Sequence, residues 1–209
     1  MRELKVLLIV ESNFLFDVCL AQDLSSMYLM DMGEAGTIAM AVPEYSLVEV
    51  DGRAADKIHG RKKRLNSAIE LTSELARSEY NKEYALAAKN NLKKLLELAD
   101  TELTLVKETI NDIRELCILI THDSDVYVRG ILRYLSSQPP FKEADCQIYE
   151  AIIEFVKEKK HEYDKIIFLT KDIKDFDHTE IHEELSDLGV KIMFSSGECV
   201  REVLKLLQT

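Results

Sequence analysis

The strongest constraint on the fold is an aliphatic run near the N-terminus, residues 4–10. The sequence there is LKVLLIV, with Lys5 as its single charged member. A strand with one solvent-facing side alternates polar and apolar residues, whereas a strand covered on both faces of a parallel sheet is apolar nearly throughout. We therefore expect residues 4–10 to form the central strand of such a sheet.

Further strand-like and helix-like segments alternate along the chain. Ser12 or Asn13 is expected to cap a first helix that extends to Tyr28, and Pro43 is expected to open a second helix. Alternating strands and helices predict an α/β fold with a doubly wound, mostly parallel sheet. The other predicted strands are 37–42, 165–170 and 190–194, and the later predicted helices are 124–135, 142–159, 181–188 and 197–207.

Residues 53–120 have a different character from the rest of the chain. No Gly or Pro occurs between Gly60 and Gly130, and the intervening sequence is rich in Ala, Leu, Glu and Lys, which favour helices. Apolar residues from Tyr84 through Leu95 to Cys117 recur mostly every three or four positions, which predicts one apolar stripe. We expect a single domain, 1–209, with an inserted antiparallel helical arm, 53–120, that turns near 78–82 and could also join two copies into a homodimer.

Composition restricts the functional classes. The chain has 209 residues and a formal charge of -11, which argues against broad binding of phosphate backbones through Lys and Arg. An acidic pocket that holds a divalent cation remains compatible with a nucleic-acid substrate, because the ion supplies the positive charge. The four cysteines form no CxxC pair and the N-terminal apolar run is short, so we expect a cytoplasmic protein without disulfides, zinc ribbon or membrane anchor.

Four acidic residues stand where a parallel sheet gathers its ligands, beyond the carboxyl ends of the strands. Glu11 directly follows the first strand, and Asp172 closely follows strand 165–170. Glu49 lies two turns into the helix after the second strand. Asp145 lies near the start of helix 142–159, on the side of its apolar residues. We expect these carboxylates to converge on one site.

Converging carboxylates repel one another and raise one another's pKa unless a cation lies between them. Magnesium and manganese ions accept such oxygen ligands while retaining water. A divalent cation can activate water for in-line attack on a phosphodiester and neutralise the charge that develops on the phosphate oxygens. The acidic pattern therefore predicts metal-dependent hydrolysis without a covalent intermediate.

Four segments together resemble the PIN-domain family. They are VESNFL at 10–15, VPEYSLVE at 42–49, EAD at 143–145 and LTKDIKDF at 169–176. The resemblance covers residues 4–52 and 140–209 and leaves out the arm. It implies a PIN-like fold and a metal-dependent endoribonuclease that uses Mg²⁺ or Mn²⁺ to cut RNA, as a toxin, a defence effector or an RNA-processing enzyme.

Roles for individual residues follow from the same resemblance. The catalytic acids would be Glu11, Glu49, Asp145 and Asp172. The metal ligands would be Glu11, Asp145, Asp172 and Asp175. Polar supports that orient these acids would be Asn13 and Thr170.

Two other functional classes stay open. Family members usually carry Asp at the position of Glu11. The segment from Asp172 to Asp175 is one residue longer here than in the family pattern. Glu11 in place of Asp, with the acidic surface, favours a catalytically degenerate PIN-like module for protein interaction. A receiver-like phosphoacceptor domain also has acids after its strands, but Lys171 is its only further support here.

Basic residues offer candidate contacts to an RNA substrate. Arg129 could clamp a phosphate through its guanidinium, with a structural salt bridge as the alternative. A basic cluster at the start of the arm could contact a phosphate backbone, with a solvated helix face as the alternative. That cluster consists of Arg61, Lys62, Lys63 and Arg64. A protein partner or antitoxin is a further expected partner, and a membrane is not.

Overall fold

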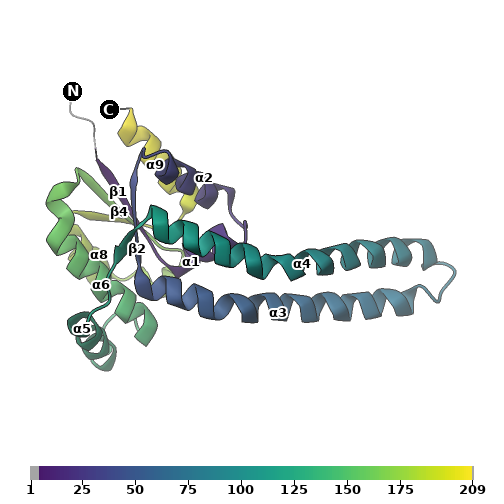
Figure 1. Ribbon diagram of the computed structural model, residues 1–209. Helices are drawn as coiled ribbons and strands as arrows, with labels where there is room; N and C mark the ends of the chain where they lie inside the picture. The colour runs from purple at the N-terminus through teal and green to yellow at the C-terminus, as the bar shows by residue number, and fades with distance from the viewer. Residues whose placement is uncertain (1–4, 209) are drawn as a thin grey trace. The chain divides into compact units, whose positions relative to one another are not determined.

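The computed structural model describes residues 5–208, except for the side chain of Asp100. Within that range the strands form a five-stranded, all-parallel sheet in the order β3-β2-β1-β4-β5 (Figure 1). The α/β fold with a parallel sheet is thus confirmed, and β1 is its central strand. The strands are β1 (Val6–Val10), β2 (Ala39–Pro43), β3 (Ile118–Ile120), β4 (Lys165–Leu169) and β5 (Val190–Met193). Residue 4 of the predicted first strand lies outside the described residues.

Helices cover both faces of the sheet. The helices in the first and last parts of the chain are α1 (Ser12–Cys19), α2 (Leu24–Glu34), α8 (Thr179–Asp187) and α9 (Ser196–Leu207). The helices between these along the chain are α3 (Glu44–Leu75), α4 (Lys82–Leu116), α5 (Ser124–Leu135), α6 (Glu143–Lys159) and the short α7 (Ile173–Phe176). A 3-10 turn spans Lys160–Glu162. In Figure 1, α2 and α9 lie on the side of the sheet opposite to α6 and α8.

One apolar cluster fixes α6 and α8 against the sheet. Leu7 and Ile9 of β1 and Phe168 of β4 are fully buried together with Ile148 and Ile152 of α6. Burial of such side chains contributes about 1.5–3 kcal/mol each to stability. The first turn of α6, which carries Asp145, is therefore held beside the carboxyl ends of β1 and β4.

Polar contacts hold α5 and α6 in register. Arg133 of α5 pairs with Glu150 of α6 at 2.5 Å and with Glu184 of α8 at 2.8 Å. Its guanidinium carbon also lies 4.7 Å from the ring centroid of Tyr149, whose hydroxyl donates to Glu184. The Arg133–Glu150 pair is shielded from solvent, since only 10% of each side chain is exposed. Together with the apolar cluster, it fixes the position of α6.

Several boundaries in the first half differ from the sequence-based expectation. The single helix expected to reach Tyr28 is two helices, because Ala21 adopts φ 48° and Asp23 then caps α2 by accepting from the Ser25 N–H. Glu11, rather than Ser12 or Asn13, caps α1. Pro43 ends β2 instead of opening a helix, and β3 was not anticipated at all, because three residues carry too little pattern.

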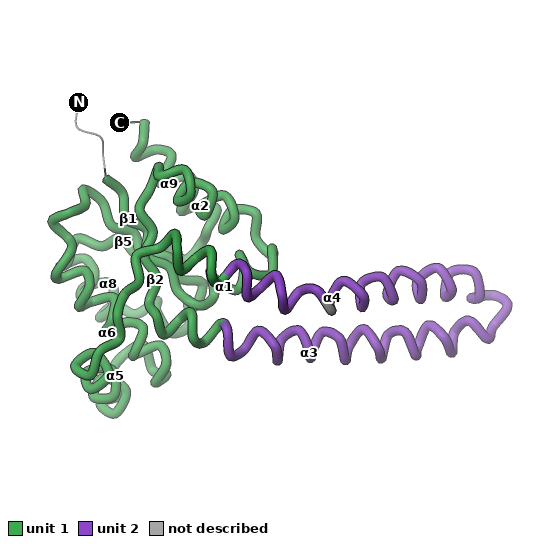
Figure 2. The backbone as a smooth tube through the Cα atoms, viewed as in Figure 1, with its two compact units in different colours: residues 1–50, 110–209 green, residues 51–109 purple. Residues whose placement is uncertain are grey.

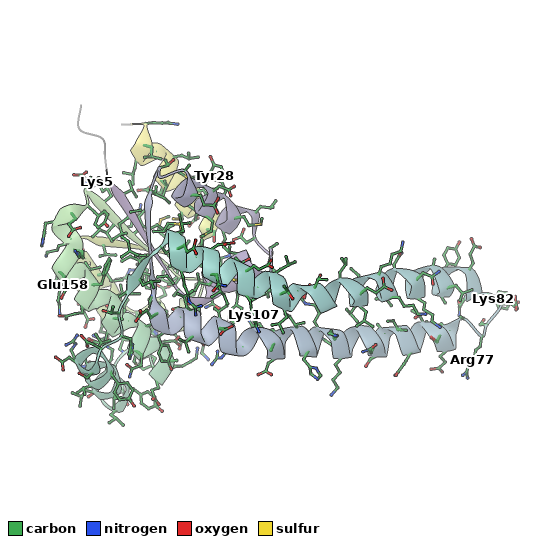
Figure 3. The ribbon with its side chains drawn as sticks, in the orientation of Figure 1. Lys5, Tyr28, Arg77, Lys82, Lys107 and Glu158 are labelled. Atoms are coloured by element: carbon green, nitrogen blue, oxygen red, sulfur yellow. The ribbon has the colours of Figure 1, made fainter. Side chains whose placement is uncertain are left out.

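Residues 51–109 form a second compact unit, distinct from residues 1–50 and 110–209 (Figure 2). The unit consists of antiparallel stretches of α3 and α4, joined by a turn that Arg77 and Lys82 flank in Figure 3. Arg61 donates to Glu102 across the two helices. Helix α3 continues through Gly52 and Gly60 without a break.

The packed face of α4 differs in part from the stripe expected from the sequence. Ala85, Ala99 and Val106 are buried, whereas Tyr84 is 79% exposed and Leu95 is 51% exposed. The expectation that these last two residues face the partner helix is therefore wrong. Among the described residues, no helix is both long and apolar enough to cross a membrane.

Two helical glycines provide a test of packing around the sheet. A Cβ on Gly33 of α2 would lie 2.5 Å from Sδ of the buried Met40, whereas a Cβ on Gly52 of α3 would meet no atom within 4 Å. We expect Gly33→Ala to lower the free energy of unfolding by about 1–3 kcal/mol through overpacking. Gly52→Ala should raise it by about 0.5–1 kcal/mol through helix propensity. Urea denaturation of both variants measures the difference, and equal effects would contradict the close approach of α2 to β2.

Candidate metal centre

Three aspartates from two separate parts of the chain meet at the carboxyl end of the sheet. Asp145 comes from the first turn of α6, Asp172 directly precedes α7, and Asp175 lies within α7. One carboxylate oxygen of each residue lies within 4.8 Å of the others. We call these residues the aspartate cluster. Carboxylate oxygens at this spacing can act as ligands of one divalent ion.

Strand register and a local turn set the position of Asp172. Val10 of β1 pairs with Leu169 of β4, so Glu11 and Thr170 are the next residues on neighbouring strands. The hydroxyl of the fully buried Thr170 accepts a hydrogen bond from the Asp172 N–H at 3.1 Å. The Asp172 carboxylate in turn accepts from the Asp175 N–H at 3.3 Å. Thr170 thus holds the turn that presents both aspartates.

Glu11 is a buried acid beside this cluster. Only 3% of the residue is exposed, and its Oε2 accepts from the Asn13 N–H at 2.9 Å. Its Oε1 is buried and makes no hydrogen bond within residues 5–208. Burial, with a smaller contribution from the charge of Asp145, raises the pKa of Glu11 to about 7. Glu11 therefore exchanges a proton near neutral pH.

The aspartates themselves are unequally compensated. Burial chiefly raises the pKa of Asp145 to about 6, and the charges of Asp175 and Asp172 add to the rise. Its Oδ2 is buried and makes no hydrogen bond among the described residues, although the Lys142 ammonium lies 3.4 Å away and partly opposes the rise in pKa. Burial also acts on Asp175, but a hydrogen bond from Lys142 outweighs it and lowers the pKa of that carboxyl. A buried, unsatisfied acid destabilises the fold unless a proton or cation compensates it.

Lys142 is a member of the site that the sequence reasoning missed. Its ammonium lies 3.4 Å from Asp145 Oδ2 and 3.2 Å from Asp172 Oδ2, and it contacts Asp175 Oδ2 most closely. Its i, i+3 spacing from Asp145 was visible in the sequence. The contacts with Asp172 and Asp175 were not, because about 30 residues separate the partners.

Glu49 and Asn13 were also predicted for the site, and neither belongs to the aspartate cluster. Glu49 Oε2 accepts a hydrogen bond from the Ser12 hydroxyl, which places it next to the residue that follows Glu11. The Asn13 side chain is exposed, and its backbone N–H is the group that supports Glu11. Neither Glu11 nor Glu49 belongs to the aspartate cluster.

Two of the candidate phosphate-binding residues, Arg129 and Arg61, form ion pairs elsewhere in the chain. Arg129 pairs with Glu154 at 3.1 Å and with Glu150 at 3.5 Å, which agrees with the structural alternative given for it. Arg61 pairs with Glu102 in the second unit. In that unit Lys62 is half-buried, while Lys63 and Arg64 are exposed.

Lys171, the residue that supported a receiver-like reading, points elsewhere. Its ammonium contacts Asp17 of α1 and lies 2.5 Å from Asp23, the cap of α2. Despite some burial, the hydrogen bond from Lys171 lowers the pKa of Asp23 well below its usual range. Lys171 therefore joins two helices and does not serve the aspartate cluster.

The donor set fits a hard divalent cation. It offers several carboxylate oxygens within a short radius, and buried oxygens of Glu11 and Asp145 lack hydrogen bonds from the described residues. Magnesium and manganese prefer such oxygen ligands, whereas the four cysteines are buried and free and contribute no sulfur to the cluster.

A comparison with protein families agrees with this geometry. The model of the PIN domain matches residues 8–176, a range that includes Glu11 and the whole aspartate cluster. Among curated proteins, none matches the sequence. The family match spans most of the chain, from within β1 to the end of α7, and it agrees with the all-parallel sheet. The chain therefore belongs to the PIN-domain family.

Proposed function

We propose that this protein is an endoribonuclease that hydrolyses RNA phosphodiesters with the aid of Mg²⁺ or Mn²⁺. The aspartate cluster next to the buried Glu11 carries the proposal, because acids so placed need a cation to be tolerated together. Membership of a family of nuclease-like domains supports the same reaction class.

Different residues of the chain would bind the ion, orient its ligands and accept a proton. Asp145, Asp172 and Asp175 would hold the ion, which supplies activation of water and neutralisation of the charge on the phosphate. Thr170 orients Asp172, and the backbone of Asn13 orients Glu11. Glu11, with a pKa of about 7, is suited to hold or accept a proton at its carboxylate near neutral pH.

An exposed aromatic ring supports a single-stranded nucleic acid as the substrate. Phe141 precedes Lys142 in the chain, and it is 48% exposed. Its ring makes an edge contact with His178, with centroids 5.0 Å apart. Aromatic rings beside a phosphate site stack on unpaired bases and thereby favour RNA loops or single strands. A toxin, a defence effector or an RNA-processing enzyme would all use this arrangement.

Binding of a divalent cation should raise the thermal stability of the protein. Mn²⁺ at about 100 times its dissociation constant should raise the melting temperature by roughly 5 °C, because the ion binds only the folded chain. Asp145→Asn should abolish the increase, and Asp187→Asn, at an exposed position at the end of α8, should preserve it. Differential scanning fluorimetry measures the shifts. No shift in the unmodified protein would remove the basis for the metal site.

In the absence of added metal, the free energy of unfolding should depend on the protonation of Glu11. The Glu11 pKa is about 7 in the folded chain against 4.5 in the unfolded one, so the folded chain binds this proton more tightly. The contribution of Glu11 to stability is therefore fully present below about pH 4.5 and is lost as the pH rises to 7, by roughly 2–3 kcal/mol.

Glu11→Gln should flatten this part of the pH profile of unfolding, because glutamine stays neutral. The matched control is Glu34→Gln, which removes an exposed carboxyl at the end of α2 and should leave the slope in place. Urea denaturation between pH 4.5 and 7.5 gives both slopes. An unchanged slope in Glu11→Gln would mean that Glu11 titrates as an ordinary solvent-exposed acid.

Cleavage of RNA tests the proposed reaction directly. In Mn²⁺, the protein should cut a fluorescent single-stranded RNA, and Asp145→Asn should reduce the rate at least 100-fold, because one of the charges that hold the ion is lost. Phe141→Ala should mainly raise KM, since it removes a stacking surface and leaves the aspartates intact.

Asp187→Asn, purified in parallel, serves as the activity control. Equal cleavage by Asp145→Asn would identify a contaminant or another site. Metal binding without cleavage of RNA or DNA would instead favour a protein-interaction module that retains the acidic site.

A further inference from the structure

Lys142 occupies a position that the proposed function does not explain. It lies at the N-cap position of α6, yet its side chain makes no capping hydrogen bond. Instead its ammonium reaches Oδ2 of all three members of the aspartate cluster. The hydrogen bond with Asp175 and the neighbouring charges raise the pKa of Lys142, so the ammonium stays charged at neutral pH.

The ammonium and a divalent ion compete for the same oxygens. A divalent ion held by the same Oδ2 atoms would lie close to the ammonium, and the two cations would repel each other. One ammonium against three carboxylates and Glu11 also leaves the site with net negative charge, so a divalent ion is still attracted.

The Lys142 side chain is free to leave. It is 57% exposed, so withdrawal toward solvent buries no charge and opens no cavity. The aspartates have less freedom, because Asp172 and Asp175 are tied to the turn after β4 and Asp145 to the first turn of α6. Exchange of cations therefore moves the lysine and leaves the acids in place.

We propose that Lys142 is a tethered counter-ion of the aspartate cluster, which compensates the acids until a divalent cation displaces its ammonium. The inference rests on the proposed metal site and adds a residue that sets the metal affinity. Lys142 acts through the aspartates and is a positioning residue of the site.

Isothermal titration with Mn²⁺ tests the competition directly. Lys142→Met removes the competing charge and keeps the length of the aliphatic chain, and it should lower the dissociation constant about tenfold. The control is Lys174→Met, which removes a charge next to Asp175 on α7 that makes no ion pair among the described residues. It should change the constant less than about threefold, because it alters only the general potential.

Thermal melting supplies the reciprocal measurement. Without metal, Lys142→Met should melt below the unmodified protein, because the acids lose their counter-ion. With saturating Mn²⁺ the difference should vanish, since the ammonium is then displaced in the unmodified protein and absent from the variant. A merely structural lysine would give the same loss with and without the ion.

The outcomes separate the two proposals. Equal Mn²⁺ affinity of Lys142→Met and the unmodified protein would overturn the tethered counter-ion and leave the metal site standing. An equal gain in Lys174→Met would also overturn it, because general charge would then explain the effect. Absence of Mn²⁺ binding to both the unmodified protein and Lys142→Met would overturn the metal site and this inference together.

Discussion

Electrostatic repulsion among carboxylates at the carboxyl end of the sheet is the constraint on which the site depends. Parallel strands end at a common edge, so the acids that follow them are brought together whether or not their charges agree. Each acid is compensated differently. Glu11 has a raised pKa, Asp145 is partly compensated, and Asp175 binds an ammonium. Acids that are only partly compensated keep an affinity for a divalent cation, as the proposed metal site requires.

The scaffold keeps the acids close in spite of this repulsion. Apolar side chains of β1, β4 and α6 pack into one buried cluster, and the network around Arg133 ties α6 to α5 and α8. The energy of this packing far exceeds the repulsion of a few partly screened charges. Asp145 and Asp172 are therefore held together, whereas the Lys142 side chain is 57% exposed and lies outside this packing.

Local pattern allowed much of the fold to be predicted. The runs that contain β1 and β4 are aliphatic enough to identify buried strands, and Gly189, with φ 79°, lies just after the predicted helix 181–188, where a glycine commonly ends a helix. The break at Ala21 was missed, since alanine gives no signal for a left-handed conformation. Likewise, the exposed Leu95 follows a helical spacing that does not say which of several possible stripes is packed.

The sequence by itself determined four of the five strands and the acids that follow them, because these depend on residues a few positions apart. Only the tertiary structure decided which acids share a site. It united Asp145 with Asp172 and Asp175, left Glu49 bound to Ser12, and placed Lys142 among the aspartates. Contacts between α6 and the segment after β4 depend on strand register and helix packing, which no local pattern encodes.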